Sequence, residues 1–170
     1  MRVAPWLLVG LLAVGTGGCA GYRLGPVNGA TAGAKTIQVV PFQNQTLEAH
    51  LTDAVTQQLR KQLQLDGAYK LTSQNDGNIV VTGTIIRYTR KNVSYSSRDV
   101  LTAEDYQIEI AAQVQARERS TGRLLLDQPV LGTTLIRVQN DLTSSERQGL
   151  PLLAESLAKN ITALLTEGSW

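Results

Sequence analysis

Apolar residues recur at every fourth position from Leu47 to Leu63, and the positions between them are mostly polar. Because a helix turns once in 3.6 residues, this spacing gathers the apolar side chains on one face and predicts an amphipathic helix. Asn44 or Thr46 is expected to cap its start. Gly67 is expected to end it as a left-handed residue.

A second helix is predicted towards the end of the sequence. Residues 143–146, Thr-Ser-Ser-Glu, have the spacing of a capping box. Apolar residues then recur at helical intervals from Leu150 to Leu164. Pro151 lies within this stretch and has no backbone N–H, so a kink or a restart of the helix is expected there.

Alternation of apolar and polar residues marks segment 106–117 as the clearest strand of the chain. One face of this strand is expected to be buried and the other to contact water. Further strands are predicted at 37–42, 69–71, 79–97 and 123–138, from apolar and β-branched runs bounded by turn-forming residues.

Three local features refine the strand predictions. The apolar positions of the longest strand change phase near Arg87, which predicts a β-bulge or a strong twist. Gly122 follows Ser120 and Thr121 in a predicted hairpin turn, where it can adopt a positive φ. Pro129 interrupts the last strand and predicts a bulge or a sheet edge.

The predicted elements follow the order β-α-β-β-β-β-α. Helices at both ends of a run of strands favour an α+β fold. We therefore expect a two-layer sandwich, with a mostly antiparallel, twisted sheet of about four to five strands and two helices packed on one face.

The sequence before the first predicted strand has a different character. Residues 1–18 combine a charged start, an apolar run and small residues, which is the order of a secretory signal peptide. The apolar run is shorter than the roughly 20 residues that cross a bilayer. Residues 19–35 are small and rich in turn formers, and are expected to form a lipid anchor and flexible tether. Residues 36–167 are expected to form a single α+β domain.

The only cysteine, Cys19, lies where cleavage of the signal peptide would expose it. With Gly17, Gly18 and Ala20 around it, the site resembles a bacterial lipobox, which implies lipidation of Cys19. Several acyl chains on one residue anchor a protein firmly to a membrane. The lack of Asp at position 20 favours the outer membrane. No cofactor other than this covalent lipid is expected.

Charge and composition exclude several classes of function. The chain has 16 Lys and Arg against 14 Asp and Glu, and its formal charge of +2 falls to +1 without Arg2. Such a balance does not favour nucleic acid as a partner. His50 is the only histidine and has no partners for a metal or catalytic site nearby in the sequence. Glu104 and Asp105 are adjacent, so a strand points them to opposite faces. No metal site is expected, and the protein is not expected to be an enzyme.

One charged feature suggests a ligand. Arg87, Arg90, Lys91 and Arg98 follow one another on the longest strand and the connection after it, interleaved with tyrosines. Guanidinium groups bind phosphates and carboxylates well, and aromatic surface suits acyl chains. The same residues also fit exposed positions that protect a sheet edge.

Several motifs occur together and in order along the chain. Their residues are Cys19, Tyr22, Arg23 and Leu24; Ile37, Val39, Pro41, Phe42, Asn44 and Thr46; and Gly83, Ile85 and Tyr88. This combination resembles the lipopolysaccharide-assembly lipoprotein family, over nearly the whole chain after the signal peptide.

The resemblance implies an outer-membrane lipoprotein, lipid-anchored on the periplasmic side of a Gram-negative envelope. Such a protein plugs the lumen of a β-barrel lipopolysaccharide translocon, helps that barrel assemble and contacts lipopolysaccharide. Arg87, Arg90, Lys91 and Arg98 are the candidate lipid contacts. The alternative is a lipoprotein of a curli-type secretion pore, which shares the strand-to-helix signature but forms a homo-oligomeric ring.

Overall fold

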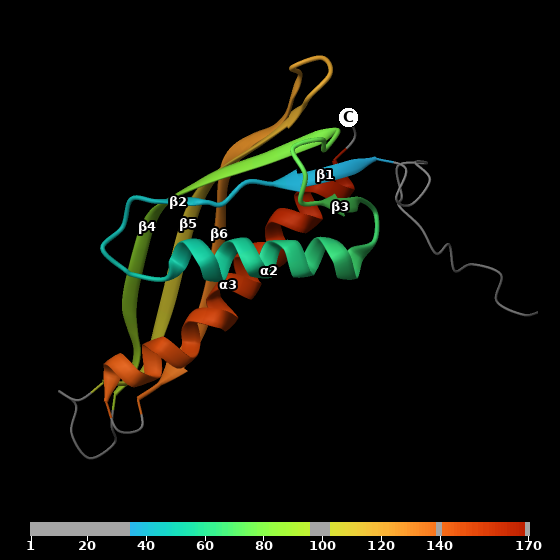
Figure 1. Ribbon diagram of the computed structural model, residues 1–170. Coiled ribbons are helices and arrows are strands. Elements are labelled where there is room, and N and C mark those ends of the chain that lie inside the picture. The colour runs from blue at the N-terminus through green and yellow to red at the C-terminus, as the bar shows by residue number, and fades with distance from the viewer. Residues whose placement is uncertain (1–34, 96–102, 139–140, 169–170) are drawn as a thin grey trace, which may run out of the picture.

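The computed structural model describes residues 35–95, 103–138 and 141–168. They form two layers, a six-stranded sheet and two helices that cross one of its faces (Figure 1). The elements are β1 (Thr36–Val39), β2 (Gln43–Asn44), α2 (Leu51–Asp66), β3 (Lys70–Thr72), β4 (Ile79–Tyr95), β5 (Ala103–Glu118), β6 (Leu124–Arg137) and α3 (Leu142–Glu167). The predicted α+β sandwich is confirmed.

The sheet is mixed. Its strand order is β3-β1-β4-β5-β6, and β2 also pairs with β4. The long strands β4, β5 and β6 form an antiparallel meander, as predicted, whereas β1, β2 and β3 make short parallel pairings. The parallel pairs arise because α2 lies between β1 and β3 and returns the chain to the same end of the sheet.

The predicted irregularity in the longest strand is a β-bulge. The pairing of β4 with β5 shifts by one residue between Ile85 and Arg87. Before the shift, Ile85 is fully buried under the helices. After it, Tyr88 and Arg90 occupy the helix side of the strand, opposite Ile110 and Ile108. The single extra residue therefore exchanges the two faces of β4 halfway along its length.

The first strand is broken at Pro41, and Phe42 anchors the break to the rest of the fold. The Phe42 N–H donates to Thr56 Oγ1 of α2 at 3.1 Å, so a buried backbone donor is satisfied by the helix. The phenyl ring lies against Gly83 of β4, where an added Cβ would come within 2.1 Å of Phe42 Cε1. Glycine at position 83 is what allows the ring to approach this closely.

Helix α2 starts later than the predicted caps. It begins at Leu51, after His50 in the left-handed region at φ 67°. Asn44 Oδ1 instead accepts from the backbone N–H and the hydroxyl of Thr46, while Asn44 Nδ2 donates to Glu48 O at 2.7 Å. The predicted start at Asn44 or Thr46 is wrong because these polar side chains close a loop on itself rather than capping a helix.

The predicted glycine turns and the predicted edge are confirmed. Gly67 has φ 73°, and its N–H donates to Leu63 O at 3.2 Å. Gly122 has φ 72° in the hairpin between β5 and β6. Pro129 lies on β6, which is the last strand of the sheet order.

Helix α3 differs from its prediction at the start and at Pro151. Its N-cap is Asp141, whose carboxylate accepts from the Ser144 N–H at 2.7 Å, so the capping box predicted at Thr143 is wrong by two residues. The helix runs continuously from Leu142 to Glu167 and does not restart at Pro151, which is exposed.

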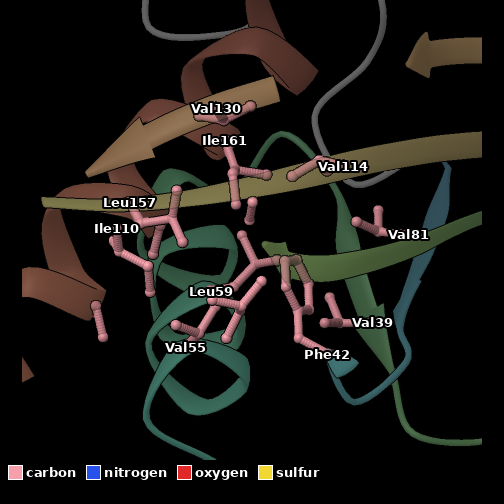
Figure 2. Close-up of a cluster of buried hydrophobic side chains, with 14 of the residues drawn as sticks. Val39, Phe42, Val55, Leu59, Val81, Ile110, Val114, Val130, Leu157 and Ile161 are labelled. Atoms are coloured by element: carbon pink, nitrogen blue, oxygen red, sulfur yellow. The ribbon is translucent and has the colours of Figure 1, made fainter. Parts of the chain in front are cut away.

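The core lies between the helices and the sheet (Figure 2). α3 packs closely on β6, where a Cβ at Gly132 would lie 2.7 Å from Leu157 Cβ. At the far end of α3, the Tyr69 hydroxyl donates to Leu165 O at 2.6 Å. Further fully buried core residues from both layers are Ile37, Leu51, Leu59, Leu63, Ile79, Ile85, Ile108, Ile110, Leu153 and Ile161.

The contact between Phe42 and Gly83 predicts a specific loss of stability. Gly83→Ala puts a methyl group into the phenyl ring, so we expect the free energy of unfolding to fall by roughly 1–3 kcal/mol, the usual cost of overpacking. Urea denaturation measures this change. Phe42→Leu in the same chain removes the ring edge, so Gly83→Ala should cost less in that background. An equal cost in both backgrounds would contradict the contact.

Candidate functional site

Two of the predicted cations lie on the sheet face that turns away from the helices, which we call the open face. Arg87 and Lys91 are in register with Ala111 and Gln107 of β5. Glu109 lies between them, 3.6 Å from Arg87 Nη2 and 4.0 Å from Lys91 Nζ. The cation side chains are 55% and 66% exposed, so both remain accessible to a ligand.

The rest of the open face combines neutral polar groups with isolated leucines. Gln113 and Gln115 of β5 donate to the carboxylate of Asp127 on β6, at 2.6 and 3.1 Å. Leu131 and Leu135 of β6 are exposed. In the part of the chain that the structure describes, both helices pack on the other face of the sheet. This face therefore offers cations beside a polar surface with a few apolar contacts.

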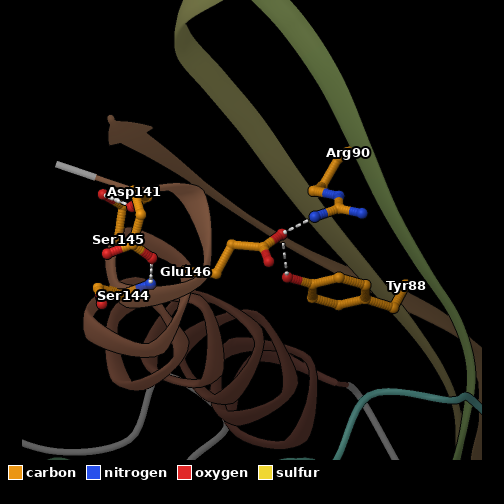
Figure 3. A network of polar contacts seen from close by, with 6 residues as sticks. All are labelled: Tyr88, Arg90, Asp141, Ser144, Ser145 and Glu146. Atoms are coloured by element: carbon orange, nitrogen blue, oxygen red, sulfur yellow. Dashed lines mark hydrogen bonds and ion pairs between the residues drawn. The ribbon is translucent and has the colours of Figure 1, made fainter. Parts of the chain in front are cut away.

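Arg90 lies on the opposite, helix side of β4. Its Nη1 is 2.8 Å from Glu146 Oε1 of α3, and the Tyr88 hydroxyl donates to the same oxygen at 3.3 Å (Figure 3). Burial, followed by the carboxylates of Glu146 and Glu48, raises the pKa of Tyr88 above its usual value, so the phenol stays protonated. The side chain of Glu146 is only 13% exposed. Tyr88, Arg90 and Glu146 thus connect the start of α3 to the far half of β4.

A hollow of about 630 Å³ lies beside β4, where β2 ends. One wall is the loop after β2, with the exposed side chain of Leu47. The other is β4 itself, with Ile86, Arg87 and Arg90. Arg87 and Arg90 thus both line this hollow, although the two residues project to different sides of the strand.

The structure brings the predicted site residues together only in part. Arg87 and Lys91 share the open face, whereas Arg90 is held by α3. Arg98 and Cys19 lie outside the described residues. Sequence reasoning missed Glu109 and Glu146, the carboxylates that hold the cations. Glu109 could have been found, since it lies on the water-facing side of the alternating segment.

The described residues were also compared with the requirements of a metal site and of a membrane-spanning helix. Across residues 35–95, 103–138 and 141–168, no group of three or more His, Cys, Asp or Glu is placed to hold a metal ion. His50 is exposed at the start of α2. No helix in these same ranges has the length and apolar character needed to cross a membrane.

A family comparison identifies the chain. Residues 34–165 match the model of the lipopolysaccharide-assembly family LptE. The match covers most of the sequence, and the chain belongs to this family, whose members are lipoproteins of the Gram-negative envelope that act in lipopolysaccharide assembly. The predicted family resemblance is therefore confirmed. The family does not favour the secretion-pore alternative. No match was found among curated proteins.

Solved structures share the fold at low sequence identity. A minor lipoprotein from Acinetobacter baumannii is 16% identical, with a TM-score of 0.51 over 78% of this chain and 92% of the other. The hypothetical protein CT253 from Chlamydia trachomatis is 12% identical, with a TM-score of 0.54 over 78% and 95%. PelC from Paraburkholderia phytofirmans, a dodecamer, is 18% identical, with a TM-score of 0.51 over 85% and 96%. These similarities concern the fold alone.

At the far end of the open face, one carboxylate ties three strands together. Asp105 of β5 accepts from Ser94 of β4 at 2.6 Å and from Arg137 Nε of β6 at 2.8 Å. The hydrogen bond from Arg137, then that from Ser94, lowers the pKa of Asp105 to about 2. Since the folded state holds the ionised form, the stability from this group is present above the ordinary pKa of 3.8 and is lost as the pH falls towards 2.

The variant Asp105→Asn should therefore change the pH dependence of stability. We expect the urea midpoint of the wild-type protein to fall between pH 4 and pH 2, and the fall to be smaller in the variant, because its amide does not titrate. Unfolding curves across this window measure the difference. Equal slopes for the two proteins would show that Asp105 does not carry the effect.

Proposed function

We propose that the protein is a subunit of the outer-membrane lipopolysaccharide transport complex, lipid-anchored through Cys19 on the periplasmic side. In this complex it occupies the lumen of a β-barrel translocon and assists the assembly of that barrel. Family membership supports the general role. The observation that carries the finer proposal is the open face, a broad sheet surface on which polar side chains surround two exposed cations.

The open face also fits direct contact with lipopolysaccharide. This lipid carries phosphates and carboxylates beside acyl chains, so a binding surface needs hydrogen-bond donors with positive charge next to apolar groups. Arg87 and Lys91 provide the charge, and Leu131 lies on the same face, opposite Ala111. Arg90 faces the helix layer and is paired with Glu146, so it contributes at the margin of this surface.

Reversing the two open-face cations tests the lipid contact. We expect Arg87→Glu with Lys91→Glu to weaken lipopolysaccharide binding about tenfold or more, the equivalent of about 1.4 kcal/mol, with little change in thermal stability, since exposed ion pairs contribute little. Binding of labelled lipopolysaccharide to the purified protein measures the effect.

The matched control uses two cations at the other end of the same sheet. Arg117 donates to Gly122 O, and Arg123 lies 3.9 Å from Glu118. Arg117→Glu with Arg123→Glu makes the same change in net charge and should leave binding near the wild-type value. An equal loss of lipopolysaccharide binding in both double variants would show that the effect depends on the net charge of the protein and not on the position of Arg87 and Lys91.

The proposed complex predicts what the native membrane contains. We expect the full-length protein, isolated from its outer membrane in mild detergent, to elute as a one-to-one complex with a single large β-barrel protein. Identification of the co-purifying chains and the size of the complex check this. A ring of identical copies would instead favour the secretion-pore alternative, and a lone monomer would contradict both.

A further inference from the structure

The sheet edges along β6 and along the far half of β4 differ in how they are protected. On β6, Pro129 has no N–H to offer a neighbouring strand. The Thr133 N–H donates to Ser156 Oγ of α3 at 3.1 Å, and Leu131 O accepts from Asn160 Nδ2 at 2.7 Å. Helix side chains thus occupy backbone groups that an added strand would need, and this edge is closed to strand addition.

The β4 edge is open beyond the end of β2. β2 pairs with β4 only at Thr84 and Ile85. From Ile86 to Lys91, the side of β4 that faces away from β5 pairs with no strand in the part of the chain that the structure describes. Six residues of strand span about 20 Å, an ordinary strand length. We call this stretch, Ile86–Lys91, the free edge.

The hollow of about 630 Å³ lies along the free edge, between β4 and the loop that follows β2. Leu47, at its wall, is the most exposed large apolar side chain that the structure describes, and Ile86 is also exposed, at 45%. An apolar side chain left fully in water at the wall of a hollow, beside unpaired strand backbone, matches the requirements of a site for an extended peptide.

The charge of the free edge distinguishes between two possible occupants, a second copy of this chain and a segment of another polypeptide. The free edge carries Arg87, Arg90 and Lys91, and a second copy of this chain paired edge to edge would bring these like charges together. An occupant with acidic side chains meets complementary charge instead, because each of the three cations remains about half or more exposed, whereas the carboxylates that pair with them, Glu109 and Glu146, are only 17% and 13% exposed.

We propose that the free edge binds an extended, acidic segment of a partner polypeptide as an added strand. The backbone of β4 supplies the hydrogen bonds, the hollow holds an apolar side chain of the segment against Leu47 and Ile86, and Arg87 and Lys91 face its carboxylates. The inference rests on the proposed function in one respect, that the protein works in a complex with another polypeptide. The inference identifies the surface of this protein and the kind of partner segment that hold the two polypeptides together.

Site-specific photo-crosslinking in the native membrane tests the geometry. A photoreactive amino acid is placed in turn at Ile86, Thr89 and Lys91 of β4, and at Leu135 of the closed edge as a control. We expect the three β4 positions to crosslink to one stretch of about eight residues in one partner chain, with the attachment points advancing steadily in one direction, because strands pair in register. Leu135 should not share this stretch.

Other crosslinking results overturn the inference. Crosslinks to a second copy of this chain would show that the free edge forms a homo-oligomer and does not bind a partner segment. Attachment points scattered over the partner, or crosslinks to lipid alone, would exclude an added strand. If a barrel protein co-purifies but the β4 positions give no ordered crosslinks, the proposed function stands and the free edge is not its docking site.

A pair of exposed leucines gives a second test, with a matched control. Leu47 lines the hollow, whereas Leu65 is exposed on α2. We expect Leu47→Glu to reduce the amount of partner retained per copy of the protein about tenfold, and Leu65→Glu to leave it near the wild-type level, while both variants keep the wild-type unfolding midpoint. Equal retention in the two variants would contradict the proposed site.

Discussion

A single extra residue in β4 determines what each face of the sheet presents. Ahead of the bulge, Ile85 lies under the helices in the core. After it, the alternation is reversed, so that Tyr88 and Arg90 meet α3 while Arg87 and Lys91 face solvent. Without the bulge, Arg87 and Lys91 would face the helix layer, and Tyr88 and Arg90 would face water. The charged surface and the fastening of α3 are therefore two results of one irregularity.

The strand-to-helix signature around Pro41 is explained by structure rather than by ligand binding. Phe42 packs on Gly83 and donates its N–H to Thr56, and Asn44 closes the loop that follows. This loop ends the pairing of β2 with β4. Phe42, Asn44 and Gly83, three of the residues that carry the family resemblance, thus contribute to the local structure that determines where the sheet edge becomes free.

The sequence predicted what depends on local periodicity and missed what depends on distant partners. The alternation in β5, the apolar stripe of α2 and the bulge near Arg87 all follow from side-chain spacing, which a single chain displays directly. The helix starts were wrong because Asn44 and Asp141 bond to nearby backbone in ways that spacing does not reveal. The two faces of the basic cluster were missed because the partner of Arg90, Glu146, is 56 residues away.

The position of α3 in the sequence has a consequence for how the chain reaches its native state. This helix follows every strand of the sheet, yet it covers β6 and bonds at Leu165 to Tyr69, 96 residues earlier. Contacts so far apart along the chain form late and slow folding. A chain completed from its N-terminal end holds an uncovered apolar meander until α3 is present. During this interval, the exposed apolar surface and strand edges favour aggregation, the hazard that chaperones counter.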